Sequence, residues 1–147
     1  MTRSNRLLPL VENANERIEE SARAVAAARE TLARQEARLA ELMNYRQQYE
    51  HSAAAAQSTR FFSVANSRAF QTQLDEAVRQ QEARVGAVRE DFERALDAWS
   101  KLRKEARAME QLVDRFVSDE RRQAERVEQR HADDSTGTRA AGRGPVE

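Results

Sequence analysis

The stretch that decides the fold is LDEAVRQQEARVGAVREDFERALDAWSKLRKEARAMEQLVDRF, residues 74–116. Its seam positions alternate four and three residues apart without a break, and they are Leu74, Val78, Gln81, Val85, Val88, Phe92, Ala95, Trp99, Leu102, Ala106, Met109, Val113 and Phe116. Only Gln81 in this series is polar. Because the period is 3.5 residues over about six heptads, it predicts a helix that packs along a left-handed supercoiled seam.

A weaker heptad pattern precedes this stretch. One set of its positions, seven residues apart, is Val11, Ile18, Val25, Leu32 and Leu39. The second set is Ala14, Ser21, Ala28, Gln35, Leu42 and Tyr49. The small residues in the second set allow a neighbouring helix to approach closely, but they bury little, at roughly 0.8 kcal/mol per methylene. This first helix is therefore marginal unless it packs on another.

The segment between the two patterns contains serine, threonine and asparagine residues that favour turns and helix caps. Asn66 or Ser67 is a plausible N-cap for the second helix. A connection of this length is typical of two antiparallel helices. The fold class is therefore all-α, a long antiparallel two-helix coiled-coil hairpin with a disordered C-terminal tail. The expected boundaries are a hairpin over 1–131, with helices at about 7–56 and 67–131 joined by 57–66, and a small, polar tail over 132–147.

Folding the chain about residue 60 predicts which seam residues face one another. The expected pairs are Leu39 with Gln81, Leu32 with Val88, Val25 with Ala95, and Ile18 with Leu102. Small residues of the first helix then face large ones of the second, and Trp99 is expected in the core. The second helix is the longer one, so Phe116, Val117 and Val127 are expected to lack an intramolecular partner. Pro9 leaves the start of the first helix open, within its first turn or after a preceding turn.

Composition argues against several classes of protein. The 147 residues include 25 basic and 25 acidic side chains, so no net field favours nucleic acid. Cysteine is absent, which excludes disulfides and thiol chemistry. The apolar run from Leu7 to Val11 contains a proline and is too short for a signal peptide or a membrane span. We therefore expect a soluble, intracellular protein without direct membrane insertion.

Residues that could carry catalysis are scarce. His51 and His131 are the only histidines and lie far apart, so a metal site is not expected. The adjacent carboxylates Asp133 and Asp134 fall in the expected tail, and a two-helix hairpin offers no concave site that excludes water. The sequence predicts a non-enzyme without cofactors, and the remaining candidates are surfaces for other proteins.

The stretch LAELMNYRQQY, residues 39–49, holds both tyrosines of the chain. Leu42 and Tyr49 fall on the seam, so core and surface roles remain open for both. Tyr45 lies beside the seam and is expected to be exposed. Folding about residue 60 brings this stretch near a second group, listed as Phe70, Leu74, Ala77 and Gln81. Phe61 and Phe62 in the connection could cap this end of the hairpin or form a mobile contact.

Three stretches in this order and at this separation resemble the flagellar export protein FliJ family. They are LAELMNYRQQY at 39–49, FQTQLDEAVRQQ at 70–81 and ALDAWSKLRKEA at 95–106. The resemblance covers residues 7 to 120. It implies an antiparallel coiled coil similar to the γ subunit of rotary ATP synthases. It also implies a cytoplasmic stalk, peripheral to the inner face of the membrane at the flagellar base, that binds the export ATPase FliI, the export gate protein FlhA and export chaperones.

The resemblance also implies which residues bind each partner. Carried over by motif, the gate-facing residues are Leu42, Tyr45, Tyr49, Phe70, Leu74, Ala77 and Gln81, with Arg38 as an additional member. The ATPase-binding end is implied at the paired chain termini, with Val11, Met109, Phe116 and Val117. Two alternatives stay open: the equivalent stalk of a virulence injectisome, and a homodimeric structural coiled coil whose second-helix seam pairs with itself.

Overall fold

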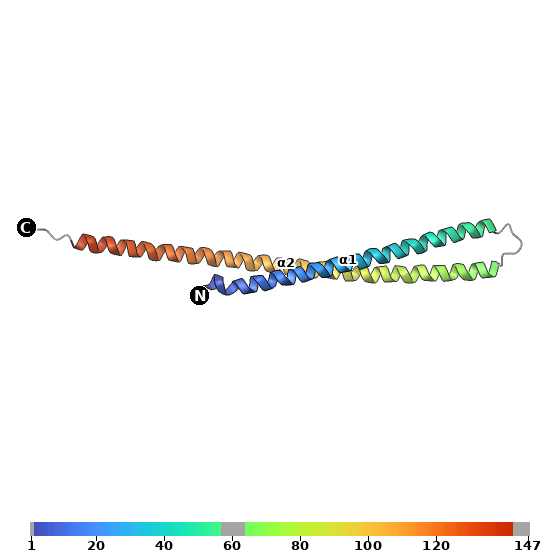
Figure 1. The fold of residues 1–147 in the computed structure, drawn as a ribbon, viewed down its shortest axis with the longest axis horizontal. Helices are drawn as coiled ribbons and strands as arrows, with labels where there is room; N and C mark the ends of the chain where they lie inside the picture. The colour runs from blue at the N-terminus through green and yellow to red at the C-terminus, as the bar shows by residue number, and fades with distance from the viewer. Residues whose placement is uncertain (1, 57–63, 143–147) are drawn as a thin grey trace, which may run out of the picture. The chain divides into compact units, whose positions relative to one another are not determined.

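Two long helices account for almost every residue that the structure, a computed structural model, describes, namely 2–56 and 64–142. Helix α1 spans Arg3–Ala56 and helix α2 spans Val64–Ala141, and no described residue lies in a strand (Figure 1). The chain divides into two compact units. The hairpin unit is Ile18–Lys101, and the terminal unit joins Met1–Arg17 to Leu102–Glu147. The predicted all-α class and the packing of two helices against each other are confirmed.

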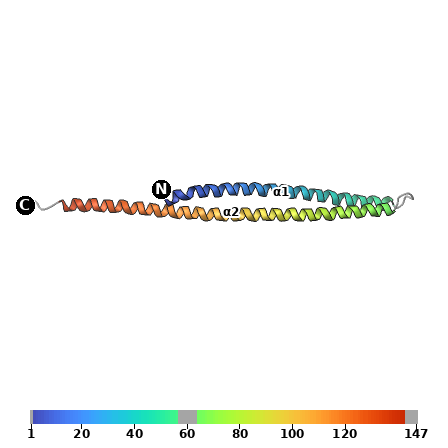
Figure 2. The ribbon, with the colours of Figure 1, turned by 90° about the horizontal axis from the view of Figure 1, so that it is seen from below.

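Within the hairpin unit, α1 and α2 lie side by side in both views (Figures 1 and 2). The most buried apolar side chains come from α2, with Val78 at 2% exposure and Leu74 and Val85 also buried. The seam positions of α1 are all half-buried. Of the predicted seam positions in both helices, only Met109 is exposed. The heptad pattern therefore identified the packing face of each helix.

The one polar residue in the α2 seam is buried and paired. Gln81 has 8% exposure, and its Nε2 donates hydrogen bonds to Gln35 Oε1 at 2.8 Å and to the Gln35 backbone oxygen at 3.0 Å. A buried amide that finds both acceptors on the facing helix avoids the cost of an unsatisfied donor. These bonds require one stagger of α1 against α2.

Contacts across the hairpin unit agree with a fold about residue 60. Tyr49 packs on Phe70, and a salt bridge joins Arg46 to Asp75 at 3.6 Å. Farther from the connection, Arg89 Nη2 lies 2.9 Å from the Glu36 carboxylate. The sequence predicted that Gln81 faces Leu39, but it did not predict the hydrogen bonds of its amide. The amide bonds to Gln35, one helical turn from Leu39, because a leucine side chain cannot accept a hydrogen bond.

Helix α1 begins at Arg3, earlier than expected. Thr2 caps it, with Asn5 N–H donating to Thr2 Oγ1 at 3.4 Å and Arg6 N–H donating to the Thr2 backbone oxygen at 3.2 Å. Pro9 lies inside the helix, so neither expected placement of this residue was correct. A proline there removes one backbone donor from the helix.

Helix α2 extends beyond both expected ends. It begins at Val64, so the prediction that Asn66 or Ser67 is the N-cap was wrong, because both lie inside the first turns. At the other end, residues 132–141, expected in the tail, are helical. Inside this part of the helix, the hydroxyl groups of Ser135 and Thr136 both donate to the Ala132 carbonyl, so neither lacks an acceptor. Phe61 and Phe62 lie outside the described residues.

Gly86 is the only glycine within the long heptad run and marks a weak point of α2. A Cβ built on it meets no atom within 4 Å, and its backbone is helical. We expect Gly86→Ala to raise the free energy of unfolding by about 1 kcal/mol, because alanine restricts the unfolded chain and favours the helix. Urea unfolding followed by circular dichroism measures the change. A destabilised variant would contradict the open space found at this position.

Candidate protein-interaction surfaces

Three aromatic rings cluster on the hairpin unit. Phe70 of α2 lies between the two tyrosines of α1, with a centroid distance of 4.6 Å to Tyr49 and 6.4 Å to Tyr45. The Tyr45 ring meets Phe70 edge-on at 77°, and the Tyr49 ring is tilted at 57°. Such aromatic pairs add stability beyond burial alone. The two tyrosines lie about one helical turn apart on α1, and the fold of the chain about residue 60 brings Phe70 beside them.

The two tyrosines differ in how they are held. Tyr49 is half-buried, and its hydroxyl donates to Ser67 Oγ at 3.3 Å. Tyr45 is 51% exposed, and within the described part of the chain its hydroxyl has no hydrogen-bond partner. Tyr45 is therefore exposed, as its register predicted, whereas Tyr49 and Leu42 lie half-buried at the edge of the seam.

A shallow groove runs beside Tyr45. Its lining residues come from both helices, and its volume is about 500 Å³, with Arg38, Glu41, Leu42, Tyr45 and Gln81 around it. Leu42 supplies an apolar wall, while Arg38 and Glu41 are exposed and bring opposite charges to the rim. We name the exposed or half-buried residues Leu42, Tyr45, Tyr49 and Phe70, with this groove, the tyrosine surface.

The remaining members of the predicted gate-facing set lie deeper. Leu74 and Gln81 are buried at 7% and 8% exposure, and Ala77 is half-buried. Leu74 and Gln81 hold the two helices together and offer little area to a partner. The structure thus brings all seven residues to one region, but only part of the set is accessible.

A second surface lies on the terminal unit. Its apolar hollow of about 150 Å³ is lined by Leu7, Leu10, Val11, Met109 and Leu112. Leu10, Leu112 and Met109 are exposed large apolar side chains, and Val117, five residues beyond Leu112 in α2, is 50% exposed. We name this hollow with Val117 the terminal apolar surface. Sequence reasoning selected Val11 and Met109 but missed Leu10 and Leu112, although the apolar run at Leu7 to Val11 was a signal.

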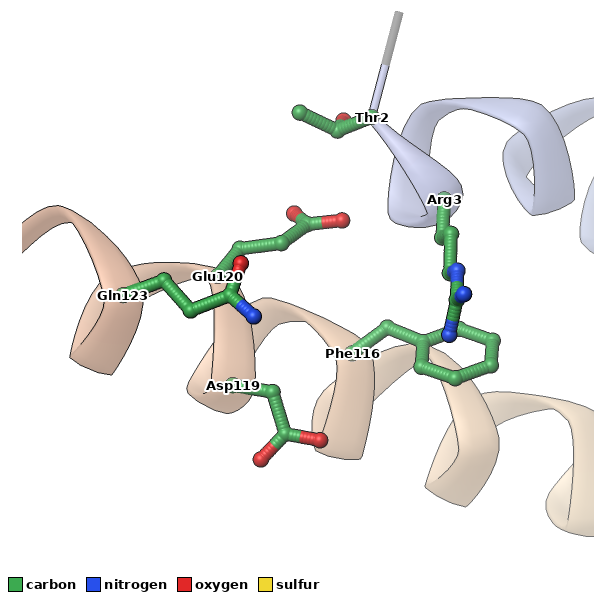
Figure 3. Close-up of a pocket in the computed structure, with 6 residues that line it drawn as sticks. All are labelled: Thr2, Arg3, Phe116, Asp119, Glu120 and Gln123. Carbon is green, nitrogen blue, oxygen red and sulfur yellow. The ribbon is translucent and has the colours of Figure 1, made fainter.

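The first turn of α1 is fastened to α2 by a clasp made of Ser4, Glu120, Arg3 and Phe116. Figure 3 shows three of these residues: Arg3, Phe116 and Glu120. Ser4 donates twice to the Glu120 carboxylate, from Oγ at 2.7 Å and from its backbone N–H at 3.1 Å. The Arg3 guanidinium carbon lies 5.9 Å from the centroid of the Phe116 ring. The expectation that Phe116 lacks an intramolecular partner was therefore wrong, because α1 begins four residues earlier than predicted.

The clasp also acts on the charge of Glu120. The hydrogen bond from the Ser4 hydroxyl, together with that from the Ser4 backbone, lowers the pKa of the Glu120 carboxyl below its usual value. Both bonds favour the ionised form, and the nearby Arg3 charge acts in the same direction. A carboxylate at this place also suits the positive end of the α1 dipole.

Among residues 2–56 and 64–142, no group of three or more His, Asp or Glu side chains is arranged to hold a metal ion. Over the same ranges, neither helix contains a stretch long and apolar enough to cross a membrane.

Comparison with known proteins gives one match. The family model described as "Flagellar FliJ protein" matches residues 3–144, nearly the whole chain. No curated protein and no solved structure matches. The matched range includes both the tyrosine surface and the terminal apolar surface.

Proposed function

The chain belongs to the flagellar FliJ family, and from this premise we propose that it is the coiled-coil stalk of the flagellar protein export apparatus. Family membership supports a role in flagellar export, and the two-helix fold suits a stalk. The role is non-enzymatic: the chain binds other proteins and positions them. It works at the flagellar base, on the cytoplasmic face of the membrane.

The tyrosine surface is the proposed contact for the export gate protein FlhA. This assignment rests on the exposure of Tyr45, an aromatic side chain that is half-exposed and packs edge-on against the Phe70 ring. Rigid, half-exposed aromatic residues are typical anchors of protein interfaces. A partner segment with an apolar side chain could pack into the adjoining groove against Leu42. Buried Leu74 and Gln81 contribute by keeping this surface in shape.

The terminal apolar surface is the proposed contact for the export ATPase FliI. Exposed apolar residues that gather around one hollow are uncommon on a surface with no partner. Val11 and Met109 line the hollow, Val117 is an exposed apolar residue farther along α2, and Phe116 lies beneath Arg3 in the neighbouring clasp. Export chaperones are further partners in this proposal, without assigned residues.

The two alternatives from the sequence are less well supported. Family membership favours the flagellar system over a virulence injectisome. In the hairpin unit, the α2 seam already faces α1 through the Gln81–Gln35 bonds, which disfavours a homodimer formed through the same seam.

Tyr45→Ala tests the gate contact. We expect this variant to weaken binding to the cytoplasmic domain of FlhA about tenfold or more, because an anchoring aromatic side chain typically contributes about 1–2 kcal/mol or more. Thermal unfolding should change little, since Tyr45 is half-exposed. Calorimetric titration and circular dichroism measure the two quantities.

Met43→Ala is a matched control, because Met43 is a large, exposed apolar residue of the same helix that does not line the groove. It should bind nearly as the unaltered chain does. Equal affinity of the Tyr45→Ala and unaltered chains would remove the tyrosine surface as the gate contact. A large loss of helicity in Tyr45→Ala would mean that the ring serves the fold instead.

A further inference from the structure

The clasp borders a pocket that combines an aromatic ring with carboxylates. Its volume is about 360 Å³, and its lining residues are Thr2, Arg3, Phe116, Asp119, Glu120 and Gln123 (Figure 3). Asp119 and Glu120 follow Phe116 by three and four residues, so both lie one turn farther along α2, and their carboxylates point in opposite directions (Figure 3). The pocket thus offers a π face with negative charge beside it, which is the environment that attracts a cationic side chain.

The cation in this pocket comes from the chain itself. Arg3 places its guanidinium 5.9 Å from the Phe116 centroid, yet it forms no ion pair with Asp119 within 4 Å. Among the described residues, the Asp119 carboxylate has neither a hydrogen-bond nor an ion-pair partner. Glu120 is already engaged by Ser4. The intramolecular arginine therefore uses the ring and leaves one carboxylate of the pocket unused.

We infer that this pocket receives a basic side chain from a partner protein, and that Arg3 occupies its place in the free chain. A partner arginine or lysine could lie over Phe116 and pair with Asp119 at the same time, which Arg3 does not do. Arg3 then competes with the partner's side chain. In the fraction of molecules in which Arg3 occupies the pocket, the partner cannot bind there, so the apparent affinity of the chain for the partner is lower. The Ser4–Glu120 bonds keep the competitor close.

This inference rests on the proposed function, in which the terminal unit contacts the export ATPase. It adds the chemistry of one contact: the partner supplies a cation beside the apolar residues. It also predicts opposite signs for two changes in the same pocket. Removal of Arg3 should strengthen binding, whereas removal of the Asp119 charge should weaken it.

The test measures binding of the full chain to the purified export ATPase by calorimetric titration at two salt concentrations. We expect Arg3→Ala to bind about three- to fivefold more tightly, and Asp119→Asn about three- to fivefold more weakly, with a smaller loss of affinity in high salt. These factors correspond to one exposed cation–π contact or ion pair. Phe116→Leu keeps an apolar side chain but loses the π face, and it should also bind more weakly.

Glu128→Gln is the matched control, because it removes one exposed carboxylate of α2 outside the pocket and should leave affinity unchanged. Circular dichroism should show that all four variants keep their helicity. If the unaltered chain binds but Arg3→Ala binds equally or more weakly, the inference is wrong and the proposed function stands. If the unaltered chain does not bind the ATPase, the ATPase contact of the proposed function fails, and the inference fails with it.

Discussion

Val78→Asp is expected to destabilise the hairpin unit strongly. Val78 is the most buried side chain of α2, with 2% exposure. An aspartate there loses the packing of the valine and places an unpaired charge between two helices, and these losses together amount to about 3–5 kcal/mol. Proteins of this size are stable by only about 5–15 kcal/mol, so a loss of this size is a large fraction of the total. The midpoint of urea unfolding, followed by circular dichroism, measures the effect.

Val127→Asp makes the same change on the same helix at a position with 52% exposure. Its free energy of unfolding should change by at most about 0.5 kcal/mol. If the two variants lost similar stability, charge repulsion along α2 would explain the effect, and the assignment of Val78 to the core would be incorrect.

The second large effect is expected from the double change Gln35→Leu with Gln81→Leu. Leucine at both positions removes the desolvation cost of the amides and completes an apolar seam, which should raise the free energy of unfolding by about 1–3 kcal/mol. The same change should also permit association between chains, because a polar pair in a seam specifies stagger and partner at some cost in stability. Light scattering should show a monomer for the unaltered chain and a dimeric fraction for the double variant.

The single substitutions distinguish the effect of the hydrogen-bonded pair from the effect of each glutamine alone. Gln81→Leu alone deprives Gln35 of its donor and should gain less stability than the double variant. Gln129→Leu, on an exposed site of α2, controls for the added surface leucine and should stay monomeric. A monomeric double variant with lower stability would show that the amides contribute more to stability than to specificity.

Much of the fold could be predicted because heptad spacing reports directly which face of a helix is buried. The seam residues from Leu74 to Val113 and the facing set from Val11 to Tyr49 emerged from spacing alone, and all of them except the exposed Met109 are buried or half-buried. The pairing near Tyr49 and Phe70 followed from the position of the turn residues. Register errors remained at the level of one turn, because apolar residues of similar size pack acceptably at neighbouring staggers.

The clasp could not be predicted, because nothing in the local sequence joins Ser4 to Glu120. Their hydrogen bond depends on where α1 starts relative to α2. The start of α1 could not be read from the sequence, because Pro9 suggested that the helix begins near or after this residue. For the tyrosine surface, register placed Tyr45 outside the seam, but only side-chain packing separates accessible Leu42 from buried Leu74. The burial of a side chain depends on contacts from both helices, whereas a heptad pattern describes the packing face of one helix only.

The Gln35–Gln81 pair also bears on how the hairpin forms. The contacts differ widely in sequence separation: 18 residues for Tyr49 and Ser67, 46 for the glutamine pair and 116 for Ser4 and Glu120. Since short loops close at lower entropic cost, the aromatic cluster can form first and the clasp last. Because heptads repeat, the two helices of a growing hairpin can pair at a wrong stagger at little cost in free energy until the pairing reaches the glutamines. There, a slipped chain would bury an amide without an acceptor, so we expect the glutamine pair to disfavour wrong staggers while the hairpin forms.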